Sequence, residues 1–142
     1  MLYFLYIFCS FRYSTFEYSG LKLAPAISTA VGGKCTATAT VTVTNTGKVA
    51  SREVAQLYLN RPGSPAAPWA LRGYGRTAVL APGASAALAF SLTAQDLSTV
   101  RADGGRAIPA GTYTIKVGGG NPRDRRVPAL VAASASFAGC TY

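Results

Sequence analysis

Five acidic side chains are the only carboxylates in the sequence, and any hydrolytic chemistry would depend on them. They are Glu17, Glu53, Asp96, Asp103 and Asp124. Cleavage of a glycosidic bond, for example, uses two carboxyl groups held about 5 to 10 Å apart across that bond. Each acid here stands alone in a separate segment, and no motif brings two of them together. We therefore expect no active site within this chain and assign no catalytic residue.

Histidine is absent from the sequence, which excludes Ser-His and Cys-His catalysis and most zinc sites. The three cysteines, Cys9, Cys35 and Cys140, are far apart and form no C-x-x-C pair. A metal site is therefore not predicted, and no cofactor is expected. In a secreted protein, two of these cysteines could pair and leave the third over.

The glycine-rich segment VGGGNPRDRR, residues 117–126, has the composition of a phosphate-binding loop. No helix follows it to present N-terminal amides, so we interpret it as a turn between the last two strands. It also holds the densest basic group, Arg123, Arg125 and Arg126, in a chain of net charge +9. The other basic residues are scattered. A basic surface, or contact with an acidic partner, is therefore favoured over specific nucleic-acid binding.

Trp69, the single tryptophan, lies in the segment PAAPWALRGYGR together with Arg72, Tyr74 and Arg76. Aromatic rings beside arginines on a loop are typical of protein interfaces and of surfaces that stack on sugars. A tryptophan that folds back over the edge of its own domain would give the same pattern. Both interpretations are open, and the four residues are candidate interface or sugar-contact residues.

Short β-strands separated by turn signals must position these residues. The clearest is CTATATVTVTNTGK, where threonines from Thr36 to Thr44 alternate with Ala and Val, which predicts one buried face and one solvated Thr face. Its last four residues, Asn45 to Lys48, have turn chemistry and predict a turn after this strand. In later strands we expect Phe90 and Tyr113 to face inward, and Asp96 to cap a turn or helical corner within 94–100. The expected strands are 11–23, 35–44, 52–60, 71–80, 84–93, 112–119 and 125–137.

Seven strands at short spacing, without an amphipathic helix, predict an all-β fold in one domain. The architecture is a seven-stranded antiparallel β-sandwich of the immunoglobulin or fibronectin type III-like kind. The segment DGGRAIPAG, residues 103–111, is expected to be a loop, and Tyr113 after it stands where a tyrosine-corner residue would stand.

The opening segment MLYFLYIFCS is apolar but too short to cross a bilayer, and it lacks the basic n-region and cleavage site of a signal peptide. We predict an apolar non-domain segment over 1–10, the sandwich domain over 11–138 and a tail over 139–142, with no membrane span.

Six segments follow one another along the chain: YSTFEYSGLKL, ATVTVTNTGKVASREVAQLYL, LRGYGRTAVLAPGAS, FSLTAQDLSTV, DGGRAIPAGTYTIKVGG and RDRR. In this order they resemble the C-terminal fibronectin type III-like domain of family 3 glycoside hydrolases, the β-glucosidases and β-xylosidases. The resemblance covers residues 11–138. The segment LSTVRADGGRAIPAGTY is more similar to the β-xylosidase branch, and EVAQLYL to the β-glucosidases.

The resemblance implies that the catalytic aspartate and glutamate lie in two preceding domains, a barrel and an α/β domain, which this sequence lacks. The chain is then expected to be a non-catalytic accessory module that packs against and stabilises those catalytic domains in polysaccharide breakdown. Its loop RPGSPAAPW, residues 61–69, would reach towards the active-site entrance. The apolar start replaces the family's usual Gly-rich lead-in, which indicates a fragment. An extracellular or secretory location follows if the parent enzyme is secreted.

The alternative is a stand-alone carbohydrate- or cell-wall-binding sandwich that uses Trp69, Tyr74 and the arginines on polysaccharide. At the other end of the chain, Phe11 and Tyr13 are predicted to form a docking seam and to be more exposed than Phe16. Strand parity places the start of the second strand and the end of the seventh at one pole of the sandwich. This predicts a disulfide between Cys35 and Cys140.

Overall fold

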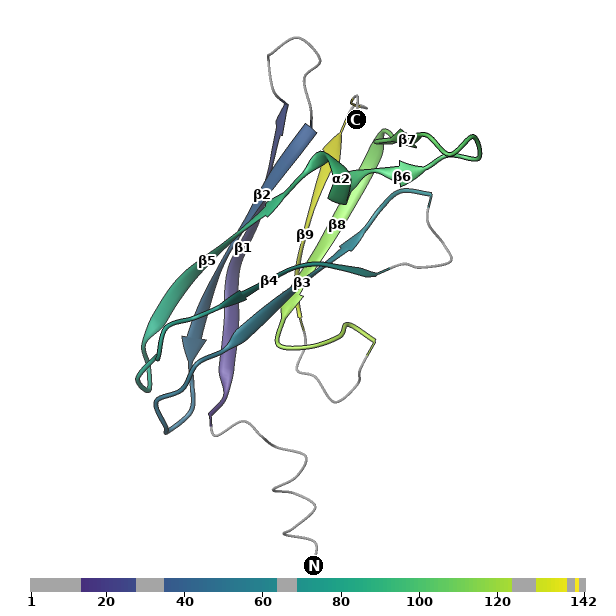
Figure 1. Cartoon of the computed structure of the whole chain (residues 1–142). Helices are drawn as coiled ribbons and strands as arrows, with labels where there is room; N and C mark the ends of the chain where they lie inside the picture. The colour runs from purple at the N-terminus through teal and green to yellow at the C-terminus, as the bar shows by residue number, and fades with distance from the viewer. Residues whose placement is uncertain (1–13, 28–34, 64–68, 124–129, 138–139, 141–142) are drawn as a thin grey trace, which may run out of the picture.

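Two antiparallel sheets face each other in the computed structural model, which describes residues 14–27, 35–63, 69–123, 130–137 and 140 (Figure 1). The first sheet has the strand order β1-β2-β5 and the second has β4-β3-β8-β9. A hairpin of two short strands, β6 and β7, each of two residues, and one short helix, α2, complete the described part of the chain. The bounds are β1 Phe16–Ile27, β2 Cys35–Asn45, β3 Val54–Asn60, β4 Ala70–Arg76, β5 Ser85–Leu92, α2 Ala94–Leu97, β6 Thr99–Val100, β7 Arg106–Ala107, β8 Gly111–Gly118 and β9 Val131–Phe137.

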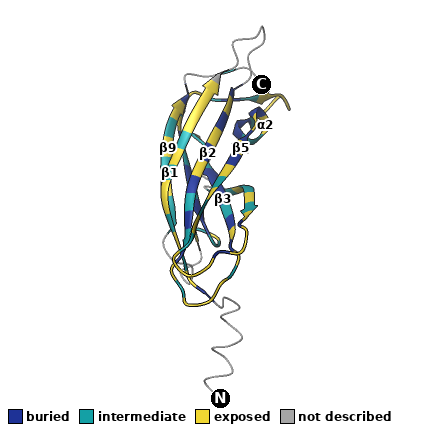
Figure 2. Cartoon of the chain, turned by 90° about the vertical axis from the view of Figure 1, so that its left-hand side faces the viewer, coloured by how far each residue is buried: buried dark blue, intermediate teal, exposed yellow. Residues whose placement is uncertain are grey.

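Strand β2 has the predicted alternation along its length. Its Ala and Val side chains, Ala37 to Val43, are at most 2% exposed, whereas the threonines between them point outward. Figure 2 faces this sheet and shows buried and exposed residues alternating along β2. The outward threonines and serines pair across strands, as Thr44 Oγ1 does with Ser85 Oγ at 2.7 Å. This outer face therefore consists mainly of small and hydroxyl-bearing side chains.

The core lies between the sheets, where Leu57, Leu59 and Ile115 of the second sheet meet Val41 and Phe90 of the first. The inward positions predicted for the later strands are confirmed, because Phe90 is 5% exposed and Tyr113 is fully buried. β4 lies against β5 and β1 lies against β9, which closes the two open sides of the sandwich.

Tyr113 combines a ring in the core with a hydrogen bond at the sandwich edge. Its ring packs against Phe137 in an edge-to-face arrangement, with centroids 5.0 Å apart. Its hydroxyl donates to the Pro109 carbonyl at 2.8 Å. A tyrosine that bonds back to the backbone a few residues upstream is the tyrosine corner of such sandwiches. The predicted position of this residue is confirmed.

Asn45, predicted only as part of a turn, is a fully buried polar residue. Its Oδ1 accepts from the Ser14 hydroxyl and from the Gly47 amide, while its Nδ2 donates to the carbonyls of Val49 and Leu80. One side chain thus joins the segment before β1, the turn after β2 and the segment before β5. We call these contacts the Asn45 network.

Several boundaries differ from the sequence expectation. The helical corner begins at Thr93, whose side chain is the N-cap, and Asp96 completes the capping box from the third helical position. The segment expected to be a loop, 103–111, contains strand β7, paired with β6. β4 ends at Arg76, earlier than expected, and β1 continues to Ile27. The beginning of the last predicted strand, 125–129, lies outside the described residues, and β9 starts at Val131.

Candidate functional site

The outer face of the second sheet differs in character from the outer face of the first. Pairing sets Val54 beside Arg76, Gln56 beside Tyr74 and Tyr58 beside Leu71. These side chains point outward because the residues between them on β3, such as Leu57, point into the core. Three large apolar side chains are left open to solvent here: Tyr74 is 77% exposed, Leu71 50% and Val54 42%. We call these outward residues of β3 and β4 the β4 face.

Trp69 borders the β4 face. It immediately precedes β4 and is half-buried. The ammonium of Lys116 lies 4.5 Å from the centre of its ring, which is the distance of a cation–π contact. Lys116 is itself the cross-strand partner of Tyr58. The indole therefore contacts its own sheet, and part of its surface stays open beside the β4 face.

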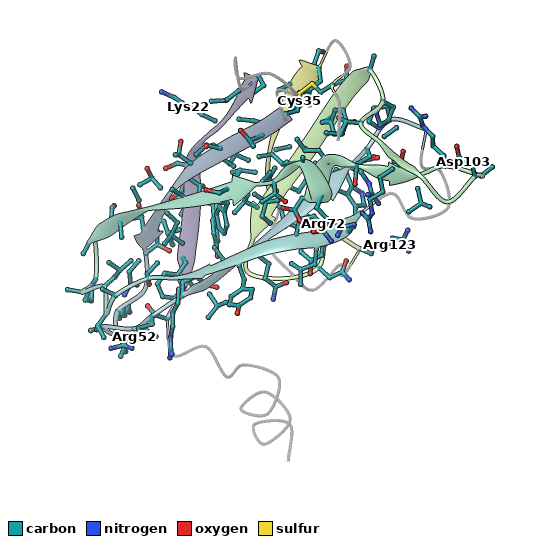
Figure 3. All side chains as sticks on the ribbon, turned by 45° about the horizontal axis from the view of Figure 1, so that its top comes forward. Lys22, Cys35, Arg52, Arg72, Asp103 and Arg123 are labelled. Atoms are coloured by element: carbon teal, nitrogen blue, oxygen red, sulfur yellow. A yellow bond between two sulfur atoms is a disulfide. The ribbon has the colours of Figure 1, made fainter. Side chains whose placement is uncertain are left out.

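Arg72 does not join Tyr74 and Arg76, although sequence reasoning grouped the three residues. The pairing of β3 with β4 shifts register, so that Leu57 pairs with Gly73 while Tyr58 pairs with Leu71. Arg72 is the extra residue of this β-bulge, and a bulge redirects the side chain it carries. Figure 3 shows Arg72 in the region below the short helix α2.

Gly73 and Gly75 allow β4 to lie close to the first sheet. A Cβ placed on Gly73 would lie 3.2 Å from the Phe90 ring, and one placed on Gly75 would lie 3.4 Å from it. Larger residues at these two inward positions would push the edge strand away from Phe90. The glycines of LRGYGR thus serve packing, and the alternate outward positions carry the exposed side chains.

The disulfide lies at the far pole of the sandwich from the turn that holds Asn45. Cys35 begins β2, and Cys140 forms an isolated antiparallel bridge with Ile108. The structure joins the two sulfurs, with Cα atoms 5.8 Å apart, which is within the usual range for a disulfide. Figure 3 shows the bond beside the label of Cys35. The bond connects the two sheets across a sequence separation of 105 residues.

The remaining candidate residues give no catalytic constellation in the described part of the chain. Asp96 accepts from the backbone and hydroxyl of Thr93, and Asp103 accepts from the Gly105 amide, so both acids stabilise local turns. No group of three or more His, Cys, Asp or Glu gathers among the described residues. None of the described helices is long and apolar enough to cross a membrane. Phe11 and Tyr13, proposed as a docking seam, lie outside the described residues.

Comparison with known proteins identifies the fold. Residues 53–120 match the family model of the fibronectin type III-like domain. The β-glucosidase cel3A of Pyricularia oryzae is 37% identical over 132 residues, covering 81% of this chain and 18% of the relative. A β-xylosidase of Formosa agariphila is 33% identical over 114 residues, covering 79% of this chain and 15% of the relative. Among solved structures, β-glucosidase D2-BGL of Chaetomella raphigera has a TM-score of 0.73 at 33% identity, covering 87% of this chain and 19% of that protein.

A two-layer antiparallel sandwich with a tyrosine corner, matched by this family model, defines a fibronectin type III-like domain. The chain is similar to the fibronectin type III-like part of family 3 β-glucosidases, so the resemblance stated from the sequence is confirmed. It spans less than a fifth of the length of the curated relatives it matches.

Proposed function

We propose that the chain is a non-catalytic accessory module that packs through its β4 face against the catalytic domains of a family 3 glycosidase. The coverage carries this proposal, because the matching part makes up 18% of the β-glucosidase cel3A and the rest of that protein lies beyond the match. The four described acids show no catalytic pairing, and two of them are occupied in turns. We therefore expect this module to stabilise the catalytic domains that it packs against, and not to hydrolyse the glycoside substrate itself.

The contrast between the two outer faces supports the β4 face as the docking surface. The face of the first sheet carries mainly hydroxyl-bearing and small side chains, which suit solvent. The β4 face exposes Leu71, Tyr74 and Val54 together, with Arg76 at its edge. Interface cores are enriched in aromatic residues and arginine relative to the rest of the surface. A tyrosine that is 77% exposed in the isolated domain is a suitable anchor for such a contact.

A domain exchange tests the docking. In this experiment the chain replaces the matching segment of the Pyricularia oryzae β-glucosidase, and the chimera is compared with an enzyme that lacks the segment. We expect the chimera to regain thermal stability and activity on an aryl glucoside, and the isolated chain to show no turnover. The double substitution Leu71→Ser with Tyr74→Ser should remove the gain. The matched control is Ala87→Ser with Ala89→Ser on exposed positions of β5, which should preserve it. A chimera no better than the truncated enzyme would refute the proposal.

A second candidate function is carbohydrate binding on the same face, supported by the open rings of Tyr74 and Trp69. Aromatic side chains bind sugars through their apolar faces while their polar edges stay hydrated. Co-sedimentation of the chain with insoluble xylan and cellulose, compared with Trp69→Ala and Tyr74→Ala, tests this function. Retention that is unchanged in both variants, or absent in the wild type, would eliminate it.

A secretory or extracellular location is part of the proposal. The Cys35–Cys140 disulfide supports it, since such bonds persist in oxidising compartments and are rare in the cytosol. Detection of the chain in culture medium with this disulfide intact would support the location, and retention of a reduced chain inside the cell would contradict it.

A further inference from the structure

Three arginines from distant parts of the sequence line one pocket beneath α2. Arg61 follows β3, Arg72 is the bulged residue of β4, and Arg106 begins β7. The pocket has a volume of about 420 Å³, and its lining also includes Gln95, Ser98, Thr99, Val100 and Gly63. That volume is within the range of small-ligand sites and is larger than a lone carboxylate or phosphate needs.

Ser98 fixes two of the three guanidinium groups. The serine is 1% exposed, and its hydroxyl is held by a hydrogen bond to the Gln95 carbonyl at 2.9 Å. Its own carbonyl accepts from Arg61 Nη1, while its hydroxyl accepts from Arg106 Nη1 at 3.1 Å. Both arginines are therefore oriented by one rigid residue. The pocket is thus preorganised before any ligand arrives.

Arg72 lies in the pocket wall with one donor unmatched. Its side chain is half-buried and lines the pocket, and its Nε has no hydrogen-bond partner in the described part of the chain. That Nε is closed off from solvent, so a ligand would contact only the part of the side chain that lines the pocket. The positive charge of a guanidinium is delocalised over the whole planar group, so this part still attracts an anion.

The electrostatics of the pocket also favour an anion. Burial, and then the positive charges of Arg72 and Arg106, lower the pKa of Arg61, and only the Tyr113 hydroxyl acts in the opposite direction. Among the described residues, no carboxylate shifts this pKa, and Asp124 lies outside the described part of the chain. Asp96 is occupied in capping α2, and Asp103 lies at the far tip of the β6–β7 hairpin, away from Arg72 (Figure 3). Like charges this close repel one another, and a bound anion would relieve the repulsion.

We propose that this pocket binds a carboxylate-bearing sugar, a uronic acid, with the carboxylate on Arg61, Arg72 and Arg106 and the sugar hydroxyls on Gln95 and Thr99. A guanidinium is a planar fork of donors that matches a carboxylate in a bidentate manner. The volume left beyond the carboxylate accommodates the ring, and the amide and hydroxyl at the pocket wall suit its hydroxyls. The site is separate from the β4 face, so this proposal stands or falls independently of docking.

Calorimetric titration of the whole chain with sodium glucuronate, glucose and inorganic phosphate, all at one ionic strength, tests the proposal. We expect saturable binding of glucuronate, none of glucose and weaker binding of phosphate. Arg72→Gln should weaken glucuronate binding about tenfold or more, because it removes a charge-assisted hydrogen bond. Arg76→Gln, the same change at an exposed position of the same strand, is the matched control and should leave the affinity unchanged.

Two further measurements keep the test decisive. If Arg72→Gln fails to fold, Arg106→Gln at the exposed rim takes its place. Glucuronate should also shift the amide resonances of Ser98 and Thr99 and should not shift those of the β4 face. Absence of glucuronate binding, equal loss in Arg76→Gln or tighter binding of phosphate would overturn the proposal.

Discussion

The substitution Asn45→Ala would remove the one side chain that joins three segments at the lower pole of the sandwich. It deletes four hydrogen bonds, made with Ser14, Gly47, Val49 and Leu80. The Leu80 carbonyl keeps a bond from the Ser51 amide, so its loss is partial. The Ser14 hydroxyl is buried and loses the acceptor given by Asn45, while the groups on Gly47 and Val49 are partly accessible to water.

A magnitude follows from these environments. A buried donor left unsatisfied costs about 1–3 kcal/mol, and partly hydrated groups cost less. We therefore expect Asn45→Ala to lower the free energy of unfolding by about 3 kcal/mol. For a domain of this size the corresponding fall in the melting temperature is roughly 10 °C. Urea unfolding monitored by fluorescence measures the free energy, and calorimetry measures the melting temperature.

The control is Asn60→Ala, the same chemical change at a half-buried position at the end of β3. It should cost no more than about 0.5–1 kcal/mol. If Asn45→Ala were as stable as Asn60→Ala, the hydrogen bonds seen at Asn45 would contribute nothing net. The reasoning that a buried polar network maintains this pole would then be wrong.

Three further predictions concern other parts of the fold. Gly47→Ala should lower the free energy of unfolding by more than about 1 kcal/mol, because its Cβ would lie 2.7 Å from the backbone nitrogen of Thr15. A lower melting temperature in thermal unfolding would show this. Burial raises the pKa of Tyr113 above its ordinary value of 10.0. The stability due to its neutral hydroxyl is therefore complete below pH 10 and decreases as the pH rises through the pKa of the folded state. Tyr113→Phe should make the free energy of unfolding less sensitive to alkaline pH, and an unchanged alkaline profile would contradict this. Thiol counting under denaturing conditions without reductant should find one reactive cysteine, Cys9, and three reactive thiols would refute the Cys35–Cys140 bond. Reduction of this bond should lower the free energy of unfolding by up to about 4–5 kcal/mol in the chain-entropy model.

The sandwich could be predicted from local sequence because its strands follow the two-residue period closely. In β2, β-branched and small residues alternate without interruption, so the buried face was evident before any contact was known. The inward position of Tyr113 followed from the same period in β8. The helical corner was anticipated through Asp96, but the N-cap at Thr93 was missed, since either residue type can cap a helix.

The residues of the candidate site could be placed from sequence only where they follow the two-residue period of a β-strand. Tyr74 and Arg76 lie on the outward face that alternation gives them, but the bulge at Arg72 shifts that residue by one position and separates it from the others. No local signal in LRGYGR marks the bulge. The pocket also required the pairing of strands, because Arg61, Arg72 and Arg106 come together only after β3, β4 and β7 are placed. Asn45 was read as a turn residue, since its composition gives no sign of burial.

The Cys35–Cys140 bond also determines how the domain responds to a force on the chain that follows β9. β9 is an edge strand of the second sheet and contacts β1 across the open side of the sandwich. A force applied to the chain beyond Cys140 reaches that residue before it reaches β9. The load then passes through the sulfur bridge to the first residue of β2, a central strand of the other sheet. Strand β9 is therefore not pulled away residue by residue, because the two sheets must first come apart.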